Sequence, residues 1–234
     1  MIECKEIEAG DLGIVYVRRN PRAKRYLLRV EDGHVYATIP LRGNERELFA
    51  FINEQRDRLL EMIKKLPERM MLDEDTELKT LTFSLKIIRL SLDNLYSTLK
   101  DGFLYISCPL QTDFTEERVQ KDLWKIIENT LRYEAKRALP VRLGKLAEKY
   151  GFQYASVKIN NSRTHWGSCT AGKNINLSLS VMLLPEHLVD YILLHELCHT
   201  VEMNHSERFW TLMDKVTEGK WAGFRKEIRK YRML

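Results

Sequence analysis

Two stretches in the first half of the chain alternate apolar and polar residues in the manner of β-hairpins. Residues 26–30 (YLLRV) and 95–99 (LYSTL) are rich in β-forming side chains, and alternating runs follow at 32–41 and 101–110. Each of these second runs opens with Asp-Gly. This pair favours a hairpin turn because both residues tolerate a positive φ. The pattern therefore predicts one hairpin in each region.

The two hairpin regions also resemble each other in sequence. DGHVYATIPL and DGFLYISCPL lie 69 residues apart and share Asp-Gly, an apolar residue before Tyr, and Pro-Leu. A helical pattern with an acidic start follows each of them, at NERELFAFINEQRDRLLEMI and TEERVQKDLWKIIENTLRYEA. These matches predict a duplicated unit of hairpin, proline and helix. Chance similarity between two common motifs is the alternative.

A polar loop between the two regions marks a boundary. The segment PERMMLDEDTELK has no helical or strand periodicity and places this boundary near residue 70. It separates an N-terminal unit of β-hairpin and helix, residues 1–70, from a larger second part, residues 71–234. The mixture of hairpins, helices and a further small sheet predicts the α+β fold class.

The second part is predicted to contain two long helices separated by strands. The first helix continues to Gly151, and Pro140 should break or kink it. Two alternating runs follow, FQYASVKIN at 152–160 and NINLSLSVML at 174–183, and both predict strands. Pro185 then stands where the first turn of a helix tolerates proline, and the apolar pattern continues beyond it.

The composition is typical of a globular chain. The 234 residues are 44% hydrophobic and 30% charged, with a formal net charge of +5. No apolar run approaches the ~18 residues of a membrane span, and the opening residues MIECKEIEAG lack the apolar core of a signal peptide. The four cysteines are scattered without a CxxC pair, as is typical of a reduced chain. We therefore expect a cytoplasmic protein with no membrane partner; the oligomeric state is not indicated.

The positive charge gathers at the C-terminus. Residues 220–234 contain six Lys or Arg and one Glu, a balance that equals the whole net charge. The rest of the chain is close to neutral, which argues against a broad nucleic-acid-binding face. Trp221, Phe224, Ile228 and Tyr231 form a helical stripe in this tail. The stripe predicts a helix docked on the body with its basic side chains in water, and contact with nucleic acid is the less favoured alternative.

The candidate chemistry lies in the stretch LLHELCHTVEMNHSERFW. His195 and His199 are four residues apart, so on a helix they lie about 40° apart on one face and can hold a single cation. Glu196 is offset from that face, where it can hold a water molecule instead of the metal. The HExxH pattern therefore predicts a catalytic zinc site.

A hydrolytic zinc site needs a third protein ligand and one position open for water. His205 is the leading candidate, but an unbroken helix would rotate it by about 240° from His199. The helix must therefore end between them. Asn204 suits left-handed geometry at that end, or the capping of a new helix with Glu207, which would deliver His205 from its first turn. Glu218, nineteen residues after His199, is the rival third ligand.

These motifs resemble a known family. HELCHTVEMNHSERFW, together with WGSC at 166–169 and INLSLSVMLLPEHLVDYILLHEL, is similar to the YgjP-like metallopeptidases, which are zincins related to SprT-like and minigluzincin proteins. The likeness is dense over residues 160–212. It is thinner toward the start, where RRNPRAKRYLLRVEDGHVYATIP resembles the family's basic opening strand and hairpin.

The resemblance implies a zinc-dependent peptidase. Its zincin-like catalytic domain would occupy residues 71–234, with a small sheet, an HExxH active-site helix and a basic C-terminal helix. The metal ligands would be His195, His199 and His205. Glu196 would be the general base for a metal-bound water that attacks the carbonyl of a peptide or protein substrate.

The residues that would bind the substrate or the developing oxyanion are less sharply indicated. Candidates are Arg163, His165, Trp166 and Tyr231, although His165 stands where the family more often has arginine. The strand ending in NSRTHWGSC is predicted to pair with an extended substrate through its backbone. Two other functions remain open: a noncatalytic binding module stabilised by zinc, and a DNA-associated repair protease of the SprT-like kind.

Overall fold

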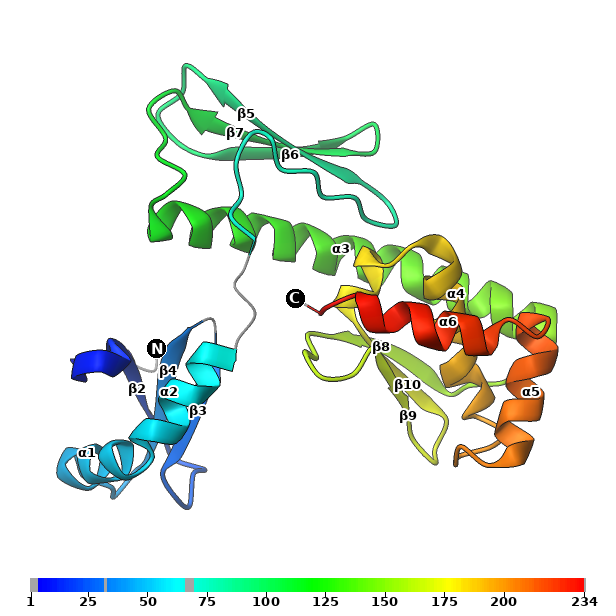
Figure 1. Ribbon diagram of the computed structural model, residues 1–234, viewed down its shortest axis with the longest axis horizontal. Helices are drawn as coiled ribbons and strands as arrows, with labels where there is room; N and C mark the ends of the chain where they lie inside the picture. The colour runs from blue at the N-terminus through cyan, green and yellow to red at the C-terminus, as the bar shows by residue number, and fades with distance from the viewer. Residues whose placement is uncertain (1–3, 32, 66–69, 234) are drawn as a thin grey trace. The chain divides into compact units, whose positions relative to one another are not determined.

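The computed structural model describes residues 4–31, 33–65 and 70–233, which form a mixed α+β structure (Figure 1). This confirms the predicted fold class. The chain divides into two compact units, Met1–Met70 and Met71–Leu234.

The first unit is a four-stranded sheet with two helices on one face. Its strands are β1 (Cys4–Glu8), β2 (Ile14–Asn20), β3 (Leu27–Glu31) and β4 (His34–Pro40), and the 3-10 turn η1 (Gly10–Leu12) joins the first two. The strand order is β1-β2-β4-β3, in which β2 and β4 run parallel and the other neighbours antiparallel. Helices α1 (Glu45–Glu54) and α2 (Arg56–Lys65) follow.

The core of the first unit lies between the sheet and these helices. Alternate residues of β2 and β4, such as Val15 and Val35, are fully buried. They pack with Leu48 and Ile52 of α1 and Leu59 of α2. Because successive side chains of a strand point to opposite faces, the intervening residues of β2 and β4 face away from the helices.

Local contacts fix where the two helices begin. The side chain of Asn44 caps α1 by accepting a hydrogen bond from the backbone of the third helical residue at 2.8 Å. The sequence predicts a single helix here, but the structure interrupts it at Gln55. Arg56 opens α2, donates to the carbonyl of Ala9 at 3.1 Å and pairs with Asp11. These contacts hold the start of α2 against η1.

The second unit contains two three-stranded sheets and four helices among its described residues. The first sheet consists of β5 (Ser84–Leu90), β6 (Tyr96–Lys100) and β7 (Phe103–Pro109), and α3 (Glu117–Tyr150) follows it. The second sheet consists of β8 (Ser156–Asn160), β9 (Gly167–Cys169) and β10 (Asn174–Ser178). The 3-10 turn η2 (Leu179–Leu183), α4 (Glu186–Cys198), α5 (Glu207–Thr217), α6 (Trp221–Glu227) and η3 (Ile228–Lys230) complete the unit.

All three sheets contain the same arrangement of three strands. In β2-β4-β3, β5-β7-β6 and β8-β10-β9, the first and third strands in the chain run parallel, and the second pairs antiparallel with the third. The hairpin β6–β7 follows β3–β4 by 69 residues at both ends of each strand. The two segments predicted to be duplicated therefore share a fold. The predicted unit did not include the strand that precedes each hairpin, β2 or β5. This strand pairs with the second strand of the hairpin, which is more distant in the sequence than a hairpin partner.

The turns of the two hairpins have the predicted backbone geometry. Asp101 and Gly102 have φ values of 51° and 76°, and Gly33 has a φ of 79°. Asp32 lies outside the described residues. The predicted strand at 174–183 is shorter than expected, because Ser178 ends β10 and its hydroxyl accepts the N–H of Ser180 to start η2.

Helix α3 is continuous, so the predicted break at Pro140 is wrong. Its 34 residues span about 51 Å. Leu139 and Leu143 on either side of the proline are fully buried in the core of the second unit, and this packing outweighs the one backbone hydrogen bond that proline removes. The helix ends at Gly151, as predicted, with a left-handed φ of 75°. Among the described residues no helix is both long enough and apolar enough to cross a membrane.

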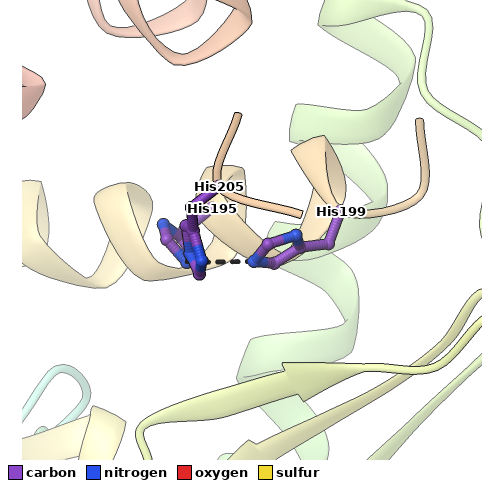
Figure 2. A group of neighbouring side chains, drawn as sticks. All are labelled: His195, His199 and His205. Atoms are coloured by element: carbon purple, nitrogen blue, oxygen red, sulfur yellow. Dashed lines mark hydrogen bonds between the residues drawn. The ribbon is translucent and has the colours of Figure 1, made fainter. Parts of the chain in front are cut away.

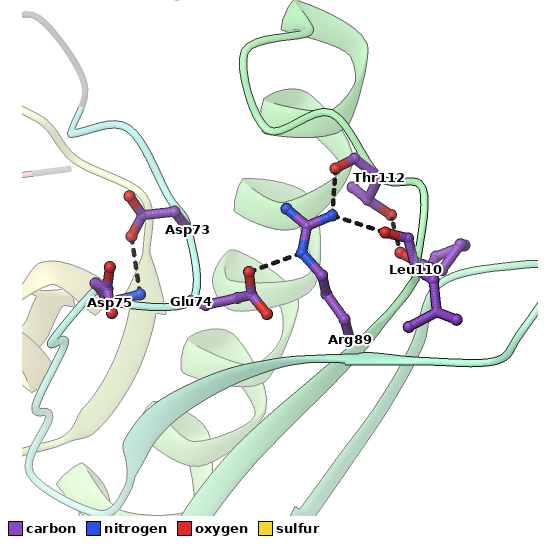
Figure 3. A network of polar contacts seen from close by, with 7 residues as sticks. Asp73, Glu74, Asp75, Arg89, Leu110 and Thr112 are labelled. Atoms are coloured by element: carbon purple, nitrogen blue, oxygen red, sulfur yellow. Dashed lines mark hydrogen bonds and ion pairs between the residues drawn. The ribbon is translucent and has the colours of Figure 1, made fainter.

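An arginine ties the entry segment of the second unit to its first sheet (Figure 3). Arg89 of β5 donates to the carboxylate of Glu74 at 2.7 Å and to the backbone carbonyls of Leu110 and Thr112 at 2.9 and 2.8 Å. The guanidinium also lies over the ring of Phe114 at 4.6 Å. The segment before β5 and the loop after β7 are thereby joined at one end of the sheet.

The basic tail docks on the body of the second unit. Trp221, Phe224, Ile228 and Tyr231 are partly buried and pack against its hydrophobic core. This confirms the predicted apolar stripe, although the regular helix α6 is only seven residues long and continues as the 3-10 turn η3.

Candidate metal centre

The helix that carries the HExxH motif ends where the motif ends. α4 runs to Cys198, and His199 is its C-terminal cap. The next helix, α5, is capped by Ser206, whose hydroxyl accepts the backbone N–H of Phe209. The predicted break is therefore present. Asn204 is not the cap and is not among the described residues with positive φ, so its predicted role is wrong: serine is an equally good cap two positions later.

This break brings three imidazole rings together (Figure 2). His205 lies in the connection directly before the cap of α5, not in the first helical turn as predicted. Its Nε2 is 3.1 Å from Nε2 of His195, and Nε2 of His199 is 3.2 Å from the same atom. Each of the three rings offers one nitrogen as a ligand, and these three nitrogens all lie within 4.8 Å of one another.

The spacing and chemistry of these nitrogens fit a zinc ion. Tetrahedral ligands at about 2.0–2.1 Å from zinc are separated from each other by roughly 3.3 Å. Nε2 of His195 can donate a proton to only one of its two nitrogen neighbours, whereas a cation satisfies all three lone pairs at once. The donor set therefore fits a metal better than a hydrogen-bonded cluster.

A backbone contact fixes the ligand nitrogen of His199. Its Nδ1 lies 3.0 Å from the carbonyl oxygen of Glu202. A carbonyl only accepts hydrogen bonds, so Nδ1 carries the proton and donates, and Nε2 keeps its lone pair. The turn after α4 thus orients this ring as well as redirecting the chain.

Desolvation favours the neutral form of two of the rings. Burial is the main cause in both cases. It lowers the pKa of His195 to about 3, with further lowering by His199 and His205. The pKa of His205 is also lowered, first by burial and then by His199 and Arg225. A metal ligand must be unprotonated, so these shifts favour metal binding.

Glu196 is buried beside the three rings and has a free oxygen. The residue is 4% exposed, and its Oε2 has no hydrogen-bond partner among the described residues. Burial raises the pKa of this carboxyl to about 8. On its other side lies β9: a Cβ at Gly167 would stand 2.6 Å from Oε1 of Glu196. Only glycine leaves room for the carboxylate, which gives the WGSC segment a physical reason for its glycine.

Aromatic side chains of α5 pack against the three imidazole rings. Phe209 is fully buried and contacts all three rings, with centroid distances of 4.5 Å to His199, 4.9 Å to His195 and 4.8 Å to His205. Trp210 stacks on His205 at 5.5 Å. This packing restricts the rings to the observed orientations.

Arg225 of α6 is a charged neighbour of the site that the sequence reasoning missed. Its guanidinium carbon lies 5.0 Å from the centroid of the Trp210 ring, and Arg225 is exposed. The ring of Trp221 stacks on the same Trp210 at 4.3 Å and anchors α6 there. In the sequence, Arg225 stands one helical turn after Trp221, and this spacing is the feature that could have indicated its position beside the docked aromatic residue.

The rival ligand Glu218 lies at the end of α5 in a different environment. It is the C-terminal cap, with a φ of 54°, and its side chain is 75% exposed. The carboxylate pairs with Lys220 at 3.1 Å, and this contact lowers the pKa of Glu218. The metal-ligand group in the described part of the chain contains His205 and not Glu218.

The four predicted substrate-binding residues lie in two places. Arg163 and His165 are exposed in the loop between β8 and β9, where the His165 ring bonds to the hydroxyl of Thr164 at 2.8 Å. Trp166 is partly buried and directly precedes Gly167. Tyr231 follows η3 and packs against the core. Their roles stay predictions.

The family comparison agrees with the chemistry of this site. A family model described as YgjP-like, metallopeptidase domain, matches residues 24–231. A crystal structure of the metallopeptidase zymogen of Pyrococcus abyssi abylysin is 26% identical and covers 41% of this chain and 99% of that chain, with a TM-score of 0.36. No curated protein shows a significant match.

Proposed function

Since the chain belongs to the YgjP-like metallopeptidase family, we propose that it is a zinc-dependent peptidase in which His195, His199 and His205 hold the ion and Glu196 is the general base. The observation that carries this proposal is the convergence of three imidazole nitrogens, with contacts of 3.1 and 3.2 Å, beside a buried carboxylate. Residues 71–234 are the proposed catalytic domain.

The role of Glu196 follows from its burial. A zinc ion bound here would supply a Lewis acid that acidifies water and polarises a carbonyl. We assign to Oε2 of Glu196 the acceptance of the proton from the attacking water, and the lack of a hydrogen-bond partner for this atom among the described residues supports the assignment. The same carboxyl group can return that proton to the departing amine.

Substrate binding is proposed along β9. This strand is one of the two edge strands in the order β8-β10-β9, and Ser168 within it is exposed. An extended peptide can pair with such an edge through backbone hydrogen bonds. Because Gly167 touches Glu196, a peptide held there would present its scissile bond close to the base.

Arg225 is proposed as the donor to the developing oxyanion or to a neighbouring carboxylate of the substrate. A second cation next to a dication is unfavourable unless an anionic group lies between them, and the transition state of peptide hydrolysis provides one. The contact of Arg225 with Trp210, which stacks on His205, holds the guanidinium at this side of the site. Arg163, His165 and Tyr231 are the alternatives for the same role.

The test is the dependence of proteolysis on zinc. The full chain is incubated with labelled casein and with internally quenched peptides as purified, after removal of metal by 1,10-phenanthroline, and after zinc is restored. We expect cleavage to disappear with the metal and to return with zinc. A protein that holds zinc and cleaves none of these substrates would instead be a noncatalytic zinc-stabilised module.

A further inference from the structure

The sheet of the first unit has an open face that carries aromatic rings. Tyr16 of β2 and Tyr36 of β4 are paired in register and stack with their centroids 5.1 Å apart. Arg29 of β3 is the next residue in the same row. The ring of His34 meets Tyr16 edge-on at 5.5 Å. All four residues lie on the face opposite the helices, and the three rings are partly exposed.

Positive charge gathers on and beside this face. Residues 18–30 contain six Arg or Lys and no acidic residue. Arg18 lies one row from the tyrosines and bonds to Thr38 at 3.5 Å, and Arg18 and Arg29 are both exposed. Arg22 and Lys24 are exposed in the loop that joins β2 to β3. Arg19 differs from these, because it donates to the backbone carbonyls of residues 41 and 43.

Acidic residues lie at the far edge of the same face. Glu6 of β1 pairs with Tyr16 in the same cross-strand row, so Glu6 and Glu8 share this face, at the edge of the sheet opposite to β3 and the basic loop. The helices α1 and α2 contain acidic and basic residues in equal number. The near-neutral balance of the whole unit therefore conceals a basic region of this face that is confined to β2, β3 and the loop that joins them.

The duplicated sheet of the second unit repeats the combination of rings and cations. At positions equivalent to His34 and Tyr36, β7 has Phe103 and Tyr105, whose centroids are 5.9 Å apart. Lys86 of β5 lies over Phe103 at 4.3 Å. Rings on an outward sheet face with a cation beside them thus occur twice.

We propose that the open face of the sheet β1-β2-β4-β3 binds single-stranded nucleic acid. Partly exposed tyrosines offer surfaces on which bases stack, and every base has such a surface. Arginines flanking the rings, and the basic loop beyond them, neutralise the phosphates. A purely acidic peptide would use the cations but not the rings, and a duplex would hide its bases from them. This inference does not rest on the proposed peptidase function.

The experiment measures binding of the full chain to a fluorescein-labelled oligo-dT 20-mer by anisotropy over a series of salt concentrations. The double variant Arg18→Glu with Arg29→Glu should bind at least tenfold more weakly. It should also lower the slope of log affinity against log salt by about 1.4, because about 0.7 is lost for each phosphate contact on a single strand. Arg22→Glu with Lys24→Glu, in the loop, should act in the same direction without touching the sheet.

The rings are tested separately. Tyr16→Leu with Tyr36→Leu should weaken binding roughly tenfold and leave the salt slope unchanged, because stacking does not release counterions. Unchanged thermal unfolding of each variant shows that the fold is intact. The matched control is Arg229→Glu with Lys230→Glu in the basic tail, which has similar charge and exposure and should not affect binding.

Three results would overturn the proposal. The first is no binding by the unmodified chain at low salt. The second is loss of binding in the tail control with no loss in the Arg18, Arg29 or loop variants. The third is equal competition by poly-glutamate of the same charge together with full binding by the tyrosine variant, which would identify the face as a site for acidic peptides.

Discussion

The sheets β2-β4-β3 and β8-β10-β9 have the same strand order but carry their candidate chemistry in different places. In the first unit the rings and cations lie on an exposed sheet face, away from the helices. In the second unit the ionisable groups lie on and directly after the helix that follows the sheet, where Glu196 and His199 are buried and His205 is exposed. Strand order alone therefore does not decide where a site forms.

The burial of the following helix accounts for the difference. α1 buries only Leu48 and Ile52, so its polar residues stay in water. α4 buries most of its residues, including Glu196. Polar side chains in such a helix lose their solvation and must find partners, or a metal, within the fold. This cost lowers the pKa of His195 and raises that of Glu196, which stand next to each other on α4.

The largest expected effect is that of removing the buried base. Glu196→Gln keeps the shape of the side chain but cannot accept a proton, so we expect kcat toward quenched peptides to fall by about 10³-fold. Zinc content and oligo-dT binding should stay the same, because neither uses this carboxylate. A kcat within tenfold of the unmodified protein would show that the base lies elsewhere.

A smaller loss is expected at the exposed margin of the same site. Arg225→Gln should lower kcat by about 10²-fold with little change in zinc content, because the donor acts mainly on the transition state. Arg229→Gln, on the same tail, is the control and should have no effect. If instead KM rises and kcat is unchanged, Arg225 binds the substrate in its ground state and the oxyanion role belongs to another residue.

The smallest of the three effects tests the contact between β9 and the base. Gly167→Ala should lower kcat by roughly tenfold to 10²-fold, because the new methyl group overlaps Oε1 of Glu196 and displaces the carboxylate. Gly223→Ala is the matched control, since a Cβ there meets no atom within 4 Å. Full activity of the Gly167 variant would mean that Glu196 works from another position than the one observed.

The features that sequence predicted correctly depend on short-range geometry. Asp-Gly turns, the end of α3 at Gly151 and the helix that carries His195 all follow from residues within a few positions of one another. The break after His199 was also predictable, because a third ligand requires it. Which residue caps the next helix was not, since Asn204 and Ser206 are similar capping residues.

The features that sequence could not supply depend on tertiary packing. Pro140 stays within a helix because buried leucines flank it. Arg225 lies beside the site because contacts such as the stacking of Trp221 on Trp210 hold α6 there. Summing charges along the chain also concealed the basic region of the first unit, since the acidic residues of β1 and the basic residues of β2 and β3 lie toward opposite edges of the sheet.

The zinc content of two single variants tests the central claim most directly. His205→Ala and Glu218→Ala are purified beside the unmodified full chain, loaded with zinc, dialysed against a weak chelator and measured by mass spectrometry of the metal. We predict about one zinc ion per chain in the unmodified protein and in Glu218→Ala, and a large loss in His205→Ala. Loss of zinc in Glu218→Ala with retention in His205→Ala, or no zinc in the unmodified protein, would contradict the three-histidine centre.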